Sequence, residues 1–328
     1  MTDPAPKKDA TAGILASTAS TLSPVEASDM SREQRTAIGA MLGDGPKGFA
    51  PEPVETMREK FAALMALFPV PPMRTSQLTL GGRPAVLVEP EGETRPGTIL
   101  YFHGGSFALG SPQTAMGLTA SLVNRTAVRA FSLDYRLAPE NPFPAAIEDC
   151  LAAYRSLLDS GVAAESIAFA GDSAGGGLTV TTTLAARNTG LPLPGALVAF
   201  SPGLDHTRTG ESMDTKEGID PFFTRQGMAH TAGFYLGGQD PNQELTAPAV
   251  LADLTGFPPI LLQVGTNELL LDDSVRLAKR ARDAEVDVIL DITAGVPHVF
   301  QSFIGQLDEA DHALDRAALF ITQRLQTL

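Results

Sequence analysis

The stretch Gly-Asp-Ser-Ala-Gly at residues 171–175 decides the fold. It follows an apolar segment, 167–170, with the composition of a buried strand, and it leads into 175–187, which has the composition of a helix. The chain must turn sharply between the two, and a glycine on each side of Ser173 relieves the crowding of such a turn. The serine hydroxyl then projects outward, and the next amide favours negative charge at the same point. The pattern predicts a nucleophilic serine on a strand-to-helix turn.

The five letters alone are a weak signal in a chain with 31 glycines. A glycine-rich turn of another α/β protein, such as a phosphate-binding loop, could carry them as well. A phosphate-binding loop has a lysine near its end, however, and no lysine stands there in this chain. The strand before the turn and the helix after it favour the nucleophile.

Strand-like and helix-like segments alternate along most of the chain. The expected strands are residues 77–80, 85–90, 98–102, 127–133, 167–170, 196–200, 259–264 and 286–292, and the expected helices are 145–160, 175–187, 272–284 and 308–326. Such alternation predicts parallel strands joined by right-handed crossovers, hence an α/β fold with a doubly wound sheet. In these sheets the functional side chains lie beyond the carboxyl ends of the strands.

Two regions do not follow this alternation. Near the N-terminus, residues 31–41 and 54–67 are expected to be helices joined by a Gly/Pro-rich link at 43–53. Between Leu204 and Ala249 the chain has Gly, Pro and Asp turns and a short helical pattern near residues 225–235. An insertion of this length at the carboxyl edge of a sheet predicts a lid or cap.

A serine nucleophile needs a base, which histidine can supply. The five histidines are His103, His206, His230, His298 and His312. His298 follows the last expected strand in a Gly/Pro loop, where its imidazole can meet Ser173. The others fall in the loop after strand 98–102, in the expected lid, or inside the last helix. We therefore expect His298 to be the base.

The imidazole in turn needs an acid that holds its tautomer and stabilises its cation. Glu268 lies just past the expected strand 259–264, and Asp272 and Asp273 follow it. We interpret the two aspartates as N-terminal caps of the next helix and prefer Glu268 as the acid, with Asp272 as the alternative. The chain order Ser173, Glu268, His298 is that of α/β-hydrolases.

Amide donors for an oxyanion are expected after the strand 98–102, where the chain reads His103-Gly104-Gly105-Ser106. Glycine amides can approach a substrate closely, so Gly104, Gly105 and Ser106, with the amide of Ala174, are expected to form an oxyanion hole. His103 then braces the loop. The alternative is an ordinary Gly-Gly turn with a capping serine.

Composition excludes several classes of function. A net charge of -14 disfavours binding to nucleic acid or to anionic membranes, and no apolar run is long enough for a membrane span. The single cysteine, Cys150, cannot form an internal disulfide and is expected in the core, and no zinc-binding spacing exists. The N-terminal residues make a poor signal peptide, so the expected location is cytoplasmic.

In combination these motifs resemble the bacterial hormone-sensitive-lipase-like, or family IV, carboxylesterases of the α/β-hydrolase superfamily. The resemblance runs from about Arg83 to the C-terminus and rests on residues 101–110, 134–140, 143–146, 171–176 and 235–238 and on the loops of Glu268 and His298. It implies a mostly parallel eight-stranded sheet with helices on both faces. It also implies a helical cap from about 1–50 and 203–245 on a catalytic core of about 51–202 and 246–328.

Three positions depart from the family pattern. Ser106 stands where a third glycine is usual, Asn141 replaces a frequent histidine, and Glu268 stands where Asp is common. The motifs and the resemblance together predict a serine carboxylesterase that uses an acyl-enzyme and needs no metal or organic cofactor. Its partner would be a small-molecule ester of short to medium chain or hydrophobic character, in a pocket formed by the apolar residues of the cap, Phe222, Phe223, Met228 and Phe234.

Other activities on the same fold stay open. A lactone hydrolase or an amidase could use the same three residues. A non-catalytic ligand-binding protein of this fold would have lost the catalytic histidine, whereas His298 is present. The resemblance is also compatible with a homodimer formed through the last strand or helix.

Overall fold

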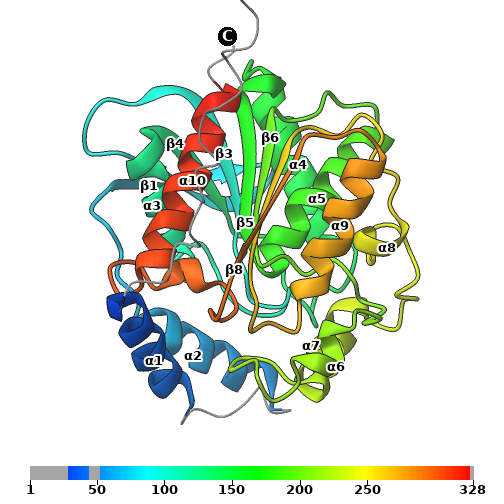
Figure 1. Cartoon of the computed structure of the whole chain (residues 1–328). Helices are drawn as coiled ribbons and strands as arrows, with labels where there is room; N and C mark the ends of the chain where they lie inside the picture. The colour runs from blue at the N-terminus through cyan, green and yellow to red at the C-terminus, as the bar shows by residue number, and fades with distance from the viewer. Residues whose placement is uncertain (1–28, 44–51, 326–328) are drawn as a thin grey trace, which may run out of the picture.

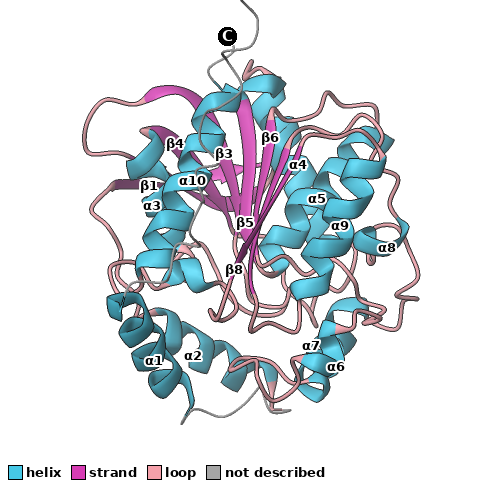
Figure 2. Cartoon of the chain, viewed as in Figure 1, coloured by secondary structure: helices cyan, strands magenta, loops and turns pink. Residues whose placement is uncertain are grey.

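The computed structural model describes residues 29–43 and 52–325, which are built around one eight-stranded sheet. The strands are β1 (Arg74–Leu80), β2 (Arg83–Glu89), β3 (Arg95–Phe102), β4 (Val128–Leu133), β5 (Ile167–Asp172), β6 (Ala196–Phe200), β7 (Ile260–Gly265) and β8 (Val288–Thr293). Their order is β1-β2-β4-β3-β5-β6-β7-β8. β2 is antiparallel to both of its neighbours, and all other pairs are parallel. Figure 2 shows the sheet running through the middle of the molecule with helices on either side of it. The predicted doubly wound α/β fold is confirmed.

Helices cover both faces of the sheet (Figure 1). On one face lie α3 (Met116–Thr126) and α10 (Asp308–Leu325), and on the other lie α4 (Ala145–Asp159), α5 (Ala174–Asn188) and α9 (Leu271–Asp283). In β3, Ile99 and Tyr101 pack on the first face, whereas Leu100 and Phe102 pack on the second. Because both faces are buried, the central strands read as continuous apolar runs, and this is what made them recognisable.

One helix of the sheet layers was not expected from the sequence. α3 has Ala115 at its N-cap, where no side chain bonds the free amides, and it contains Gly117 and Thr119, which favour helices weakly. It packs against α10 and against β2 and β4, so most of its residues are buried and the helix shows no polar face that would reveal its 3.6-residue period. Cys150 is buried in α4, as expected.

Further helices lie beyond the carboxyl ends of the strands (Figure 1). They are α1 (Asp29–Gly43), α2 (Val54–Met65), α6 (Ser212–Thr215) and α7 (Arg225–Leu236). The short elements α8 (Pro248–Leu251), η1 (Ala164–Ser166) and η2 (Phe300–Ser302) complete the described chain. Of the first cap segment expected at 1–50, residues 1–28 and 44–50 lie outside the described residues.

α2 is attached to loops of the sheet by Arg58. Its Nε donates to the carbonyl of Ala108 at 2.9 Å and its Nη2 to that of Ala138 at 3.0 Å, and the guanidinium also pairs with Glu140 at 2.7 Å. α1 is held to α10 through Arg35, whose guanidinium pairs with Glu309. These contacts place two N-terminal helices over the strand ends.

Candidate active site

Ser173 stands on a sharp turn between β5 and α5. Its φ of +53° lies in the left-handed region, which non-glycine residues rarely adopt. The turn also brings Gly175 against the neighbouring strand β3, where a Cβ atom would collide with the carbonyl oxygen of Phe102. Glycine is therefore required at position 175, and the strained turn aims the Ser173 side chain away from the sheet.

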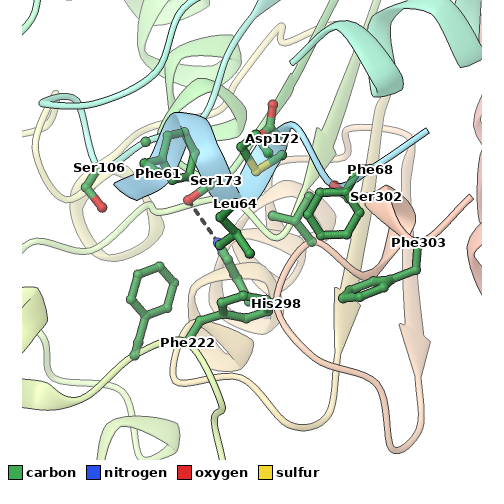
Figure 3. A pocket seen from close by; sticks show the side chains of 14 residues that line it. Phe61, Leu64, Phe68, Ser106, Asp172, Ser173, Phe222, His298, Ser302 and Phe303 are labelled. Carbon is green, nitrogen blue, oxygen red and sulfur yellow. Dashed lines mark hydrogen bonds between the residues drawn. The ribbon is translucent and has the colours of Figure 1, made fainter. Parts of the chain in front are cut away.

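Ser173, His298 and Glu268 form a continuous hydrogen-bonded chain. The Oγ of Ser173 is 2.9 Å from Nε2 of His298, the contact dashed in Figure 3. On the other side of the ring, Nδ1 of His298 is 2.8 Å from Oε2 of Glu268. All three side chains are buried, and they follow β5, β8 and β7 respectively. This arrangement can accept a proton from the serine and stabilise the resulting imidazolium.

Ser201, which the sequence analysis did not single out, holds Glu268 in place. Its Oγ donates to Oε1 of Glu268 at 2.8 Å and accepts from the amide of Val299 at 3.0 Å. The amide of Gly265 donates to the same carboxylate oxygen. Ser201 follows β6, so the strand-end rule that pointed to the other site residues would also have found it. Ser201 therefore links the loop that contains Glu268 to the loop that contains His298.

The interpretation of Asp272 and Asp273 as helix caps is wrong. Oδ2 of Asp272 accepts from the amide of Ser212 at 2.9 Å, and Oδ2 of Asp273 accepts from the amides of Leu204 and Asp205 at 2.7 and 3.0 Å. The N-cap of α9 is Leu270, which makes no side-chain cap, and the amide of Asp272 donates to Oγ of Ser212 at 3.1 Å. The insertion packs on this end of α9. Backbone amides of the insertion that have no other acceptor donate to both carboxylates. Asp272 does not contact His298.

The loop after β3 leaves two amides free near Ser173. Gly104 differs from our expectation, because its amide donates to Oδ1 of Asp172 at 3.1 Å and is occupied. The amides of Gly105 and Ser106 have no acceptor among the residues that the structure describes. Gly105 has a φ of +116°, and Ser106 adopts a left-handed φ of +53° despite its Cβ. Both line the cavity that contains Ser173.

Asp172 anchors the loop after β3 by accepting hydrogen bonds. Tyr101 donates its hydroxyl to Oδ1 of Asp172 at 2.8 Å, beside the bond from Gly104. Burial raises the pKa of Asp172 to about 6, and these two hydrogen bonds oppose the rise.

His103 lies in the same loop and faces the core. Its Nδ1 is 2.7 Å from the carbonyl oxygen of Gly104, and its ring stacks on Tyr135 with centroids 4.2 Å apart. Burial lowers the pKa of His103 to about 4, so the ring is neutral at pH 7. This placement fits the expected bracing role and leaves His298 as the histidine in contact with Ser173.

An apolar cavity of about 590 Å³, including its open mouth, leads to Ser173. Figure 3 shows the Ser173–His298 contact with Leu64, Phe68 and Phe222 around it. α2 therefore lines the cavity together with the insertion. The sequence did not reveal this role of α2. Two residues expected in this lining lie elsewhere: Phe234 packs against α2 and the loop after β3, and Met228 lines a second cavity.

Two further observations concern the described residues as a whole. Within residues 29–43 and 52–325, no group of three or more His, Cys, Asp or Glu side chains is placed to hold a metal ion. In the same part of the chain, no helix combines the length and the apolar character that crossing a membrane requires.

A serine on a strand-to-helix turn, with a histidine and a carboxylate at neighbouring strand ends, defines the class of α/β-hydrolases. Residues 99–302 match the family described as alpha/beta hydrolase fold. An acetyl-hydrolase of Streptomyces hygroscopicus is 41% identical over 68% of this chain and 75% of its own. An esterase of Acinetobacter venetianus is 36% identical over 68% of this chain and 74% of its own.

The solved structures that resemble this chain include esterases as well. An esterase from the bacterial hormone-sensitive lipase family is 37% identical with a TM-score of 0.84, covering 89% of this chain and 98% of its own. EstE5 soaked with p-nitrophenyl butyrate is 34% identical with a TM-score of 0.85, covering 90% and 99%. This chain belongs to the α/β-hydrolase fold family, among the hormone-sensitive-lipase-like esterases, and it is a carboxylic ester hydrolase.

Proposed function

We propose that the protein is a serine carboxylesterase in which Ser173 is the nucleophile, His298 the general base and Glu268 the acid that orients the base. The single observation that carries this proposal is the hydrogen-bonded chain from Ser173 through His298 to Glu268, with contacts of 2.9 and 2.8 Å. The polar neighbours of Glu268 keep its carboxylate directed at Nδ1 of the ring.

The reaction proceeds through an acyl-enzyme. Ser173 Oγ attacks the ester carbonyl while His298 takes its proton, and the amides of Gly105, Ser106 and Ala174 stabilise the oxyanion. The intermediate collapses, and His298 protonates the departing alcohol. Water then attacks the acyl-enzyme with the same base and frees Ser173. No step requires a metal or an organic cofactor.

The first cavity favours esters that carry a hydrophobic group of short to medium length on the side of His298. The lining of this cavity is aromatic and aliphatic. It includes Phe61 and Leu64 of α2, Phe68 just after α2, and Phe222 and Phe223 of the insertion. Such a lining binds apolar groups by burying them, and its limited volume disfavours long chains. The relative named as an acetyl-hydrolase also supports small acyl groups.

We propose that the cap consists of α1, α2 and the insertion at about 203–245, which extends the expected N-terminal cap segment, about 1–50, into the part of the chain that the sequence analysis assigned to the core. Support comes from the position of these helices beyond the strand ends and from the residues that α2 and the insertion contribute to the cavity.

A homodimer through β8 is part of the proposal. β8 is an edge strand, and it leaves Ile289 and Ile292 about half exposed, at 50% and 45%. Analytical ultracentrifugation should show a dimer that Ile289→Lys dissociates. A wild-type monomer at micromolar concentration would contradict it.

The direct test of the activity uses Ser173→Ala. This variant should fold with the circular dichroism spectrum of the wild type and should have lost hydrolysis of p-nitrophenyl butyrate. Substantial activity in the folded variant would refute the assignment of the nucleophile. A series of acyl chain lengths on the wild type then tests the proposed preference for short to medium chains.

A further inference from the structure

A second cavity, of about 370 Å³ including its opening, also reaches Ser173 but does not include His298. On the side of the sheet its wall includes Ser106, Phe107, Ser173 and Ala174. On the side of the insertion it includes three polar side chains, Thr231, His206 and Arg208. The hydroxyl of Thr231 is bonded to carbonyls of its own helix, which leaves His206 and Arg208 as the two groups that a ligand could meet.

Two nitrogens of the Arg208 guanidinium, Nε and Nη1, are buried and have no acceptor within the described part of the chain, while the residue as a whole is partly exposed. Burial lowers the pKa of Arg208, and the charges of Asp273 and Asp205 only partly offset this. A buried cation is costly unless something pairs with it.

The two carboxylates are occupied by other donors. Asp205 accepts from the amide of Thr207 at 2.8 Å and from Arg276 at 3.3 Å, and Asp273 accepts the two backbone amides given above. Neither carboxylate accepts a hydrogen bond from Nε or Nη1 of Arg208. The unmet donors of Arg208 are therefore left for a ligand in the cavity.

The backbone holds Arg208 in this position at some cost. Its φ of +54° is left-handed, a conformation that a residue with a long side chain rarely adopts. The flanking turn is tied down, since the amide of Thr209 donates to Asp205 at 3.2 Å and Arg276 donates to the carbonyl of Thr209 at 2.6 Å. Strain that the surroundings enforce at a cavity is typical of a residue kept for binding.

His206 adds a second unpartnered polar atom to the same cavity. Its Nδ1 is buried with no hydrogen-bond partner among residues 29–43 and 52–325. Burial and the charge of Arg208 hold the pKa of His206 well below its ordinary value, so the ring is neutral. A ligand that satisfies the guanidinium of Arg208 carries oxygen acceptors, and the neutral imidazole can either donate to it or accept from it.

The geometry of proton transfer tells the two cavities apart. The departing alcohol takes its proton from His298, so it must lie in the first cavity, which contains that residue. The acyl group stays bonded to Ser173, so it lies in the second cavity. A planar guanidinium binds a carboxylate through two parallel hydrogen bonds, which suits the unmet donors of Arg208.

Resting on the proposed serine esterase function, we propose that the second cavity binds the acyl group and that Arg208 selects acyl groups ending in a carboxylate. The substrates would be half-esters of short dicarboxylic acids. One water cleaves the ester bond, the alcohol leaves with one proton, and the new carboxyl group releases its proton to solvent. The reaction needs no oxidant, reductant or further reactant.

The test compares two ethyl esters of nearly equal shape. Monoethyl succinate carries the carboxylate, and ethyl isocaproate has an isopropyl group in its place. Ethanol release gives kcat/KM for each, and the wild type should prefer the half-ester. Arg208→Leu should lower the ratio of the two kcat/KM values about a hundredfold, the usual effect of removing one partner of a buried charge pair.

Arg225→Leu is the matched control, because it removes a cation of the same insertion that pairs with exposed Asp214 outside the cavity. Its ratio should equal that of the wild type. An Arg208→Leu variant with an unchanged ratio, or a wild type that prefers ethyl isocaproate, would overturn the proposal. If Arg208→Leu does not fold, inhibition of the wild type decides: succinate should compete with ethyl isocaproate more strongly than isocaproate does, and the reverse order would overturn it.

Failure of the esterase proposal itself looks different. In that case the wild type hydrolyses neither ester, or Ser173→Ala hydrolyses both.

Discussion

Replacing Ser201 by alanine removes one oxygen that joins the loop of Glu268 to the loop of His298. The lost hydroxyl donates to Glu268 and accepts from the amide of Val299, and both contacts are buried. A hydrogen bond to a charged group is worth about 1.5–3 kcal/mol, and an unpaired buried amide costs about 1–3 kcal/mol. Because Glu268 keeps the amide of Gly265, we expect the free energy of unfolding to fall by about 3 kcal/mol.

Activity should fall less than it does when a member of the catalytic chain is removed. Ser173 and His298 keep their contact in Ser201→Ala, and Glu268 loses one of its supporting donors, so kcat/KM should drop roughly tenfold to hundredfold. Urea unfolding and hydrolysis of p-nitrophenyl butyrate at pH 7 measure the two effects.

Ser132→Ala is the matched control, because its Oγ is buried and has no partner in the described chain. We expect this variant to change stability by less than about 1 kcal/mol and to leave activity unaltered. A wild-type kcat/KM in Ser201→Ala would refute the positioning role, and so would an effect no larger than that of Ser132→Ala.

Three further variants test the acid, the loop anchor and the attachment of α2. Glu268→Gln should reduce kcat by about 10⁴-fold, as loss of the triad acid does in other serine hydrolases, whereas Asp272→Asn should stay within about tenfold; the reverse ranking contradicts the choice of acid. Asp172 has a folded pKa of about 6 against an ordinary 3.8, so its neutral form stabilises the fold below pH 3.8 and this stability is lost as the pH rises through 6. Asp172→Asn should therefore become more stable than the wild type by up to about 3 kcal/mol between pH 4 and 7 in urea unfolding, and a constant difference across that range would count against it. Arg58→Met should raise KM severalfold and speed hydrogen exchange in α2, because two backbone carbonyls and Glu140 lose their donor; unchanged exchange would show that α2 does not depend on Arg58.

Much of the fold could be predicted because both faces of the sheet are buried. A strand such as β5, buried at every position, must be apolar throughout, and the chain shows this directly. The site followed from one topological rule, that parallel strands place their carboxyl ends at the same edge. The rule places Ser173, Glu268 and His298 at neighbouring strand ends, where the structure has them in contact.

The remaining features depend on contacts between segments distant in the sequence. The apolar stripe of α2 shows that one face is covered, but not that Phe61 and Leu64 line the cavity at Ser173. The acidic pair at the start of α9 fits a helix cap equally well, and only the packing of the insertion directs Asp273 to other amides. Arg208 looks like an ordinary surface arginine until the cavity is seen around it.

The identity of the nucleophile is tested most directly by peptide mass spectrometry after inactivation with diethyl p-nitrophenyl phosphate. We predict one diethylphosphoryl group per chain, on the peptide that contains Ser173, with loss of activity in proportion to labelling. Ser173→Ala should take up none. Labelling of another residue, such as Ser106 or Ser302, in step with inactivation would contradict the account.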